Sequence, residues 1–121
     1  MIKAIHTLIY SDDPPATRAF VRDVLGWPYV EHPESEPGWL IFKSGPSEVG
    51  VHPTSGTSQL HHEVSLMCDD IQATVAGLRA KGAEFSGEPQ DYGFGVGVNL
   101  KLPGAGEILV YEARHPEAYS L

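Results

Sequence analysis

Cysteine is almost absent from this chain of 121 residues, because Cys68 is its single thiol. One cysteine cannot form an internal disulfide, and this usage fits a reducing compartment. Long hydrophobic runs are also missing, since no apolar stretch reaches the roughly 18 residues needed to cross a bilayer. The first residues lack the apolar segment of a secretory signal peptide. We therefore expect a cytoplasmic protein with no membrane partner.

Basic residues are scarce as well. The 8 Lys and Arg stand against 16 Asp and Glu, which gives a formal net charge of −8. Nucleic-acid binding needs basic surfaces that face the phosphates, so this balance argues against a nucleic-acid partner. It is compatible with a cationic ligand, although most of the carboxylates are expected to form an ordinary solvated surface.

The chain contains an internal repeat. When the sequence is shifted by 57 positions, six identities align within eleven residues: Asp12 with Asp69, Asp13 with Asp70, Ala16 with Ala73, Thr17 with Thr74, Ala19 with Ala76 and Arg22 with Arg79. Such density indicates a duplication. In the same register His6 aligns with Glu63, so two residue types that bind metals occupy equivalent points.

The repeat predicts a single α+β domain over 1–121, built from two tandem β-α-β-β-β modules. The first module spans about 1–53. Alternating apolar side chains predict a strand over 2–11, and Asp13 with two prolines predicts the start of a helix over 16–25 that ends at Gly26. Three short strands should follow at Tyr29–Glu31, Trp39–Lys43 and Glu48–His52.

The second module spans about 61–115, and 116–121 should form a tail. It begins with a strand at His62–Cys68, followed by a helix that Asp70 caps and Gly82 ends. The glycine-rich segment Tyr92–Gly97 is expected to be a mobile loop. The remaining strands are predicted at Glu84–Ser86, Val96–Leu102 and Glu107–Glu112.

Four side chains form a candidate metal site, because each module offers one in its first strand and one in its last. They are His6, His52, Glu63 and Glu112. Neighbours along a strand point to opposite faces, so we expect the four to share the sheet face away from the helices, if their apolar neighbours pack under those helices. Two imidazoles and two carboxylates suit a divalent ion such as Zn, Ni, Co, Mn or Fe.

The duplicated pattern, the opening His6-Thr7-Leu8-Ile9-Tyr10-Ser11-Asp12-Asp13 and the Leu25-Gly26-Trp27 after the first helix together resemble the vicinal oxygen chelate superfamily. This superfamily includes glyoxalase I, bleomycin-resistance proteins and extradiol dioxygenases. The resemblance covers nearly the whole chain and implies curved sheets that form a cup, with helices on the outer face. It also implies metal ligands at the first and last strands of each module, which correspond to the four candidates.

The chain departs from glyoxalase I at two of these positions. Glyoxalase I usually has Glu in the last strand of its first module and His in the first strand of its second, whereas here His52 and Glu63 exchange the two types. The basic residues that hold the glutathione carboxylates also have no evident counterpart. His62 could replace Glu63 as a ligand if the strand carries a bulge.

Aromatic residues supply the predicted pocket. Tyr10 lies on the strand face of His6, while Tyr92 and Phe94 lie beside flexible glycines and are expected to form a wall or lid. Other candidates have simpler interpretations: Trp27 and Trp39 as core or dimer-interface residues, Cys68 as a packed thiol, and His32, His61 and His115 as solvated loop or tail residues.

The first hypothesis is a metal-dependent lyase or isomerase of the glyoxalase-like type, expected to be a homodimer, that acts on a small oxygen-chelating substrate. Its ion would stabilise an oxyanion or enolate, and Glu112 or Glu63 would serve as the base. The second hypothesis is a metal-free protein that binds an antibiotic or metabolite, as bleomycin-resistance proteins do. Extradiol-type dioxygen chemistry and a purely structural metal are further alternatives.

Overall fold

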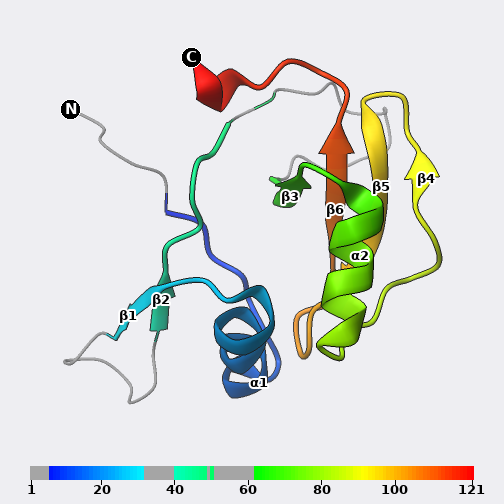
Figure 1. Cartoon of the computed structure of the whole chain (residues 1–121). Coiled ribbons are helices and arrows are strands. Elements are labelled where there is room, and N and C mark those ends of the chain that lie inside the picture. The colour runs from blue at the N-terminus through cyan, green and yellow to red at the C-terminus, as the bar shows by residue number, and fades with distance from the viewer. Residues whose placement is uncertain (1–5, 32–39, 49, 51–61) are drawn as a thin grey trace, which may run out of the picture.

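The structure, a computed structural model, describes residues 6–31, 40–48, 50 and 62–121. Helices and strands are mixed along this part of the chain, and the strands form two sheets (Figure 1). The predicted α+β class is therefore confirmed. The curvature of a cup stays a prediction.

The second module has the predicted order of elements. It consists of β3 (Ser65–Cys68), α2 (Ile71–Ala80), β4 (Gln90–Asp91), β5 (Gly95–Lys101) and β6 (Glu107–Ala113). The strands lie side by side in the order β3-β6-β5-β4, with β3 parallel to β6 and the other pairs antiparallel. The strand predicted at 84–86 is reduced to a single bridge between Phe85 and Leu100. Helix α2 joins β3 to β4 at the far edge of the sheet, and the antiparallel strands β5 and β6 then follow, which brings β6 beside β3.

The first module differs more from its prediction. Its α1 (Pro14–Phe20) continues into a π-helical segment η1 (Val21–Leu25), and β1 (Tyr29–Glu31) pairs antiparallel with β2 (Leu40–Phe42). Residues 6–11 do not form the predicted strand. Of the strand predicted at 48–52, Glu48 and Gly50 lie outside any strand, and the rest lies outside the described residues. Alternating apolar residues predict a segment with one apolar face, but a strand also needs a neighbouring strand with which its backbone can form hydrogen bonds.

The repeat is visible in the way both helices begin. The carboxylate of Asp13 accepts a hydrogen bond from the backbone N–H of Ala16 at 3.3 Å, and the carboxylate of Asp70 accepts one from Ala73 at 3.0 Å. These are the same two pairs that align in the sequence. Each cap satisfies an N–H that the first helical turn leaves unpaired. Gly26 ends the first helical segment with a φ of 72°, as predicted.

The core lies between α2 and the sheet of the second module. Ile71 and Val75 of α2 belong to one buried cluster with side chains of β5 and β6, namely Val98, Leu100, Ile108 and Val110. Phe20 of α1 belongs to the same cluster. Burial of this apolar area is the main stabilising term of the fold.

The start of α1 is tied to the turn between β5 and β6. The buried hydroxyl of Thr17 donates to the carbonyl of Pro103, and the N–H of Asp12 donates to the carbonyl of Gly104 at 2.7 Å. These bonds fix one end of the first module against the second.

A search of the described residues finds no helix with the length and apolarity that a membrane crossing requires.

Candidate functional site

Strand β6 has two faces with different roles. Ile108 and Val110 are buried beneath α2, so every second residue from them faces the helix. Leu109 and Tyr111 lie on the opposite face, where Tyr111 is paired with Gly97 of β5. The side away from α2 is the face on which the sequence predicted the site.

Glu112 lies on the helix side, which differs from its predicted orientation. Its side chain shares the parity of Ile108 and Val110, and one carboxylate oxygen accepts a hydrogen bond from the backbone N–H of Ile71 at 3.0 Å. Ile71 is the first residue of α2, so the carboxylate lies at the positive end of the helix dipole. The preceding residue, Tyr111, lies on the sheet face where Glu112 was expected.

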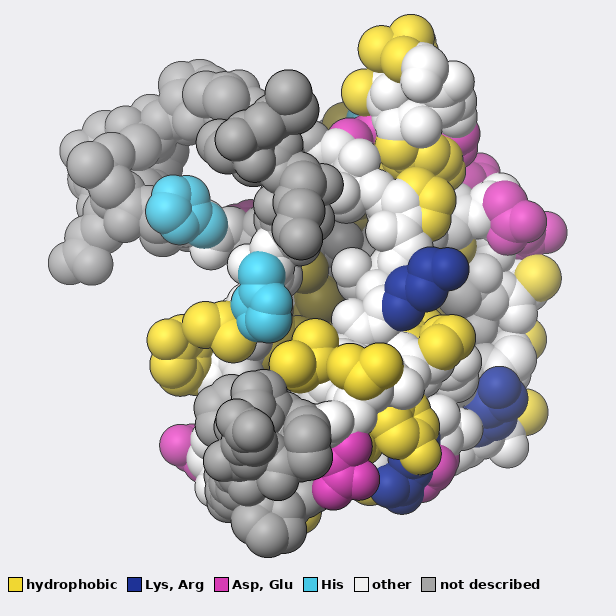
Figure 2. Space-filling view, turned by 90° about the vertical axis from the view of Figure 1, so that its left-hand side faces the viewer, with side chains coloured by type: hydrophobic (Ala, Val, Ile, Leu, Met, Phe, Trp, Pro, Cys, Tyr) yellow, Lys and Arg dark blue, Asp and Glu magenta, His cyan; other side chains and the backbone are white. Residues whose placement is uncertain are grey.

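The other predicted metal ligands are not assembled within the described residues. His6 and Glu63 are exposed, as is His62, and His52 lies outside the described residues. Figure 2 shows histidine side chains on one face beside hydrophobic ones. No group of three His, Cys, Asp or Glu side chains in the described part of the chain could hold a metal ion. A complete ligand set would therefore have to include a residue outside the described part of the chain, and His52 is the predicted one.

Three aromatic rings form a cluster at the β4–β5 hairpin. Tyr92 and Phe94 stack with ring centroids 5.8 Å apart and planes 13° apart, and Phe94 meets the ring of Tyr111 edge-on at 5.2 Å. Tyr92 and Phe94 are 45% and 46% exposed. Tyr10, the third predicted pocket residue, is 86% exposed, and in the described part of the chain no ring contact joins it to this cluster. We call Tyr92, Phe94 and Tyr111 the aromatic cluster.

The hairpin turn explains why Phe94 is presented to solvent. The N–H of Tyr92 donates to the carbonyl of Gly95 at 2.9 Å, so Gly93 and Phe94 are the two central residues of a tight turn. Gly93 has a φ of 87°, a conformation that glycine adopts without strain. Two-residue loops that contain glycine are common connections in β-hairpins. Part of the segment predicted to be a loop, Gly95–Gly97, belongs to β5, and its mobility stays a prediction.

Gly95 and Gly97 make room for the Tyr111 ring. A Cβ atom on Gly97 would lie 2.8 Å from Cβ of Tyr111, and one on Gly95 would lie 2.9 Å from a ring carbon of Tyr111. Both glycines are buried although they are on the sheet face away from α2. The ring of Tyr111 therefore lies across β5 where other residues would place side chains.

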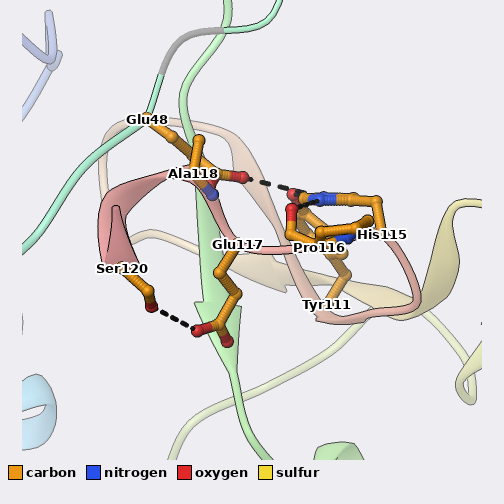
Figure 3. A network of polar contacts seen from close by, with 7 residues as sticks. All are labelled: Glu48, Tyr111, His115, Pro116, Glu117, Ala118 and Ser120. Carbon is orange, nitrogen blue, oxygen red and sulfur yellow. Dashed lines mark hydrogen bonds and ion pairs between the residues drawn. The ribbon is translucent and has the colours of Figure 1, made fainter.

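A polar network extends from Tyr111 to the C-terminal segment. The Tyr111 hydroxyl and Nε2 of His115 are 3.1 Å apart, and the same nitrogen lies 3.7 Å from Oε1 of Glu48 (Figure 3). Burial and the nearby Glu48 carboxylate raise the pKa of Tyr111 above its usual value. His115 is thus half-buried and hydrogen-bonded, which corrects the prediction of a solvated tail residue. No sequence motif signalled this contact.

Cys68 is packed against the core on the helix side of the sheet, as predicted. Burial raises the pKa of its thiol, and the carboxylate of Glu112 contributes in the same direction. A thiol that is protonated at neutral pH is a poor nucleophile.

Comparison with known proteins identifies the family. A profile of the Glyoxalase/Bleomycin resistance protein/Dioxygenase superfamily matches residues 3–101. The chain belongs to this superfamily. The resemblance drawn from the duplicated pattern is therefore confirmed. The uncharacterized protein YetH of Bacillus subtilis (strain 168) is 28% identical over 120 residues, which cover 93% of this chain and 100% of YetH.

Solved structures share the fold. Lactoylglutathione lyase from Agrobacterium tumefaciens matches with a TM-score of 0.60 and 23% identity, covering 92% of this chain and 94% of the lyase. TnmS3, an antibiotic-binding protein from Streptomyces sp. CB03234, matches with a TM-score of 0.58 and 18% identity, covering 93% of this chain and 98% of TnmS3. With sequence identities this low, the structural similarity shows a common fold and no more.

Replacing Glu112 tests its place at the start of α2. Glu112→Ala leaves the N–H of Ile71 without its acceptor, so we expect the free energy of unfolding to fall by about 1–2 kcal/mol in urea denaturation. Glu112→Gln keeps an acceptor oxygen and loses only the attraction between the charge and the helix dipole, so its loss should be about 0.3–1 kcal/mol. An unchanged stability of Glu112→Ala would contradict this placement.

Proposed function

We propose that this protein binds a small planar aromatic molecule against the aromatic cluster, on the sheet face away from α2. The observation that carries the proposal is the pair of stacked rings of Tyr92 and Phe94, both nearly half exposed in a well-defined turn. Covering an exposed aromatic ring with a ligand removes apolar surface from water and so favours binding. Flat ligands make the most contact with such rings.

The geometry around the aromatic cluster supports a role in ligand binding more than a role in the hydrophobic core. Phe94 rests edge-on against Tyr111, and Tyr111 in turn packs against Gly95 and Gly97, so the described contacts support these rings from the side of the sheet. A rigid aromatic surface loses little conformational entropy when a ligand binds to it. The polar network behind Tyr111 places hydrogen-bonding groups next to this apolar surface.

The superfamily also supports this proposal. Members of the superfamily bind small molecules, and one structural match is named as an antibiotic-binding protein. The departure of Glu112 from the predicted ligand set favours the metal-free hypothesis of the sequence analysis over the metal-dependent one.

Calorimetric titration with two probes of similar size tests the aromatic site. We expect the protein to bind 2-methoxynaphthalene more tightly than the saturated 2-methoxydecalin. Phe94→Leu retains an apolar side chain but loses the ring, so the affinity for 2-methoxynaphthalene should fall about two- to tenfold.

Tyr29→Leu is the matched control for Phe94→Leu. Tyr29 is also 46% exposed, but it lines a groove of about 320 Å³ beside α1 and lies in the other sheet. Its replacement should leave the affinity unchanged. Equal losses in the two variants, equal affinity for the two probes or no binding of either probe would each contradict the proposed site.

A metal-dependent lyase or isomerase is the second candidate. The observation that favours it is the matched pair of helix caps, because the sequence repeat places His6 and Glu63 seven residues before Asp13 and Asp70. Superfamily members often bind divalent metals. On this candidate His6, His52 and Glu63 hold the ion, which supplies Lewis-acid chemistry when bound. Glu63 then replaces Glu112 as the proposed base, since Glu112 is bonded to α2.

Elemental analysis of protein purified without a chelating tag tests this second candidate. We expect near-stoichiometric Mn, Fe, Co, Ni or Zn in the wild type, loss of that metal in His6→Ala and retention in Glu112→Gln. Loss in Glu112→Gln would instead restore Glu112 as a ligand. If the wild type binds none of the five ions after reconstitution, the metal-dependent candidate is wrong.

A further inference from the structure

We propose that the phenol oxygen of Tyr111 is a hydrogen-bond acceptor that selects aromatic ligands carrying a hydroxyl or amino group. This inference rests on the proposed function and narrows its ligand class. It depends on which way the hydroxyl proton of Tyr111 points, and the contacts of His115 decide that direction.

The tautomer of His115 follows from its partners. Nδ1 lies 2.9 Å from the carbonyl oxygen of Pro116, and a carbonyl can only accept, so we assign the imidazole proton to Nδ1. In neutral imidazole Nε2 then carries a lone pair. The Tyr111 hydroxyl, 3.1 Å away, is therefore the donor and Nε2 the acceptor.

The C-terminal segment, whose Pro116 carbonyl accepts from Nδ1, holds His115 in this position, and Glu48 is bonded to the same segment. One oxygen of Glu48 lies 3.7 Å from Nε2, and the other accepts a hydrogen bond from the N–H of Ala118 at 2.8 Å. Figure 3 shows the Glu48 side chain extending toward His115 beside the segment that contains Pro116 and Ala118. Glu48 is only 17% exposed, so its charge acts at close range on the groups around it.

With its proton directed to His115, the Tyr111 oxygen offers its lone pairs to a ligand that lies against Phe94. Ring contact with Phe94 and the space above Gly95 fix the position of the phenol. Since burial and Glu48 keep the pKa of Tyr111 high, the group remains a neutral phenol at physiological pH. A ligand donor would be favoured here, whereas an ether or carbonyl oxygen would face another acceptor.

Paired probes that differ by one methyl group test the inference. In calorimetric titrations at pH 8, 2-naphthol has a hydroxyl donor and 2-methoxynaphthalene has none. We expect the wild type to prefer 2-naphthol about three- to tenfold. Tyr111→Phe should abolish this preference, while its affinity for 2-methoxynaphthalene stays within about twofold because the ring remains.

His115 is a positioning residue, and two variants separate this role from simple support of the fold. His115→Phe keeps an aromatic ring but removes the acceptor, so the phenol becomes free to donate and the preference for 2-naphthol should fall. His115→Gln supplies an amide oxygen that can accept, so the preference should recover. Tyr29→Phe removes a hydroxyl in the other sheet and should leave the preference unchanged.

The outcomes distinguish the inference from the function on which it rests. If the wild type binds both probes equally, or if Tyr111→Phe retains the preference for 2-naphthol, the role of Tyr111 is wrong while the aromatic site stands. If neither probe binds, both the inference and the proposed aromatic site are wrong.

Discussion

Packing of β6 beneath α2 is the constraint on which the assignment of the site depends. Val110 and Ile108 are buried under the helix, and a strand alternates its side chains strictly between two faces. Tyr111 must then face away from the helix, and Glu112 must face toward it. A register shift of a single residue would exchange the two, and it would also expose the apolar residues that hold the sheet to α2.

Because of this alternation, the neighbouring residues Tyr111 and Glu112 make contacts on opposite faces of the sheet. Glu112 satisfies an N–H at the start of α2 and so helps to fix the helix over the sheet. Tyr111 carries an aromatic ring and a hydroxyl to the other face, where Phe94 and His115 contact it. Among the described residues, the Tyr111 phenol, the His115 imidazole and the Glu48 carboxylate thus form the polar network on this side, whereas Glu112 lies on the other.

The superfamily fold is compatible with both binding and catalysis, since its structural matches here include a lyase and an antibiotic-binding protein. Fold alone therefore does not choose between the two. In this chain the choice depends on side chains around one strand, and the arrangement of Glu112 and the aromatic cluster favours binding. The two helix caps support the metal-dependent alternative, because they occur at aligned positions of the sequence repeat that pairs His6 with Glu63.

Local signals in the sequence were sufficient for much of the fold. Asp13 and Asp70 cap helices as predicted, because a cap depends on residues only three positions apart. The order of elements in the second module also follows from short apolar patterns and turn residues. The family could be recognised because the duplicated pattern extends over nearly the whole chain.

The site was harder to predict for physical reasons. Residues 108–111 are all apolar or aromatic, so their sequence does not show which of them face the helix. The alternating glycines suggested flexibility, yet a side chain at Gly95 would collide with the ring of Tyr111 and one at Gly97 with its Cβ. The contact between Glu48 and His115 joins residues far apart in the chain, and no local pattern records it.

Amide chemical-shift mapping by NMR with 2-methoxynaphthalene tests the central claim most directly. If the face of β6 away from α2 is the binding face, the largest shifts should occur at Phe94, Gly97 and Tyr111, and the N–H of Ile71 should move little. Shifts centred on α1 and Tyr29, or on Ile71 at the start of α2, would contradict the assignment of this face.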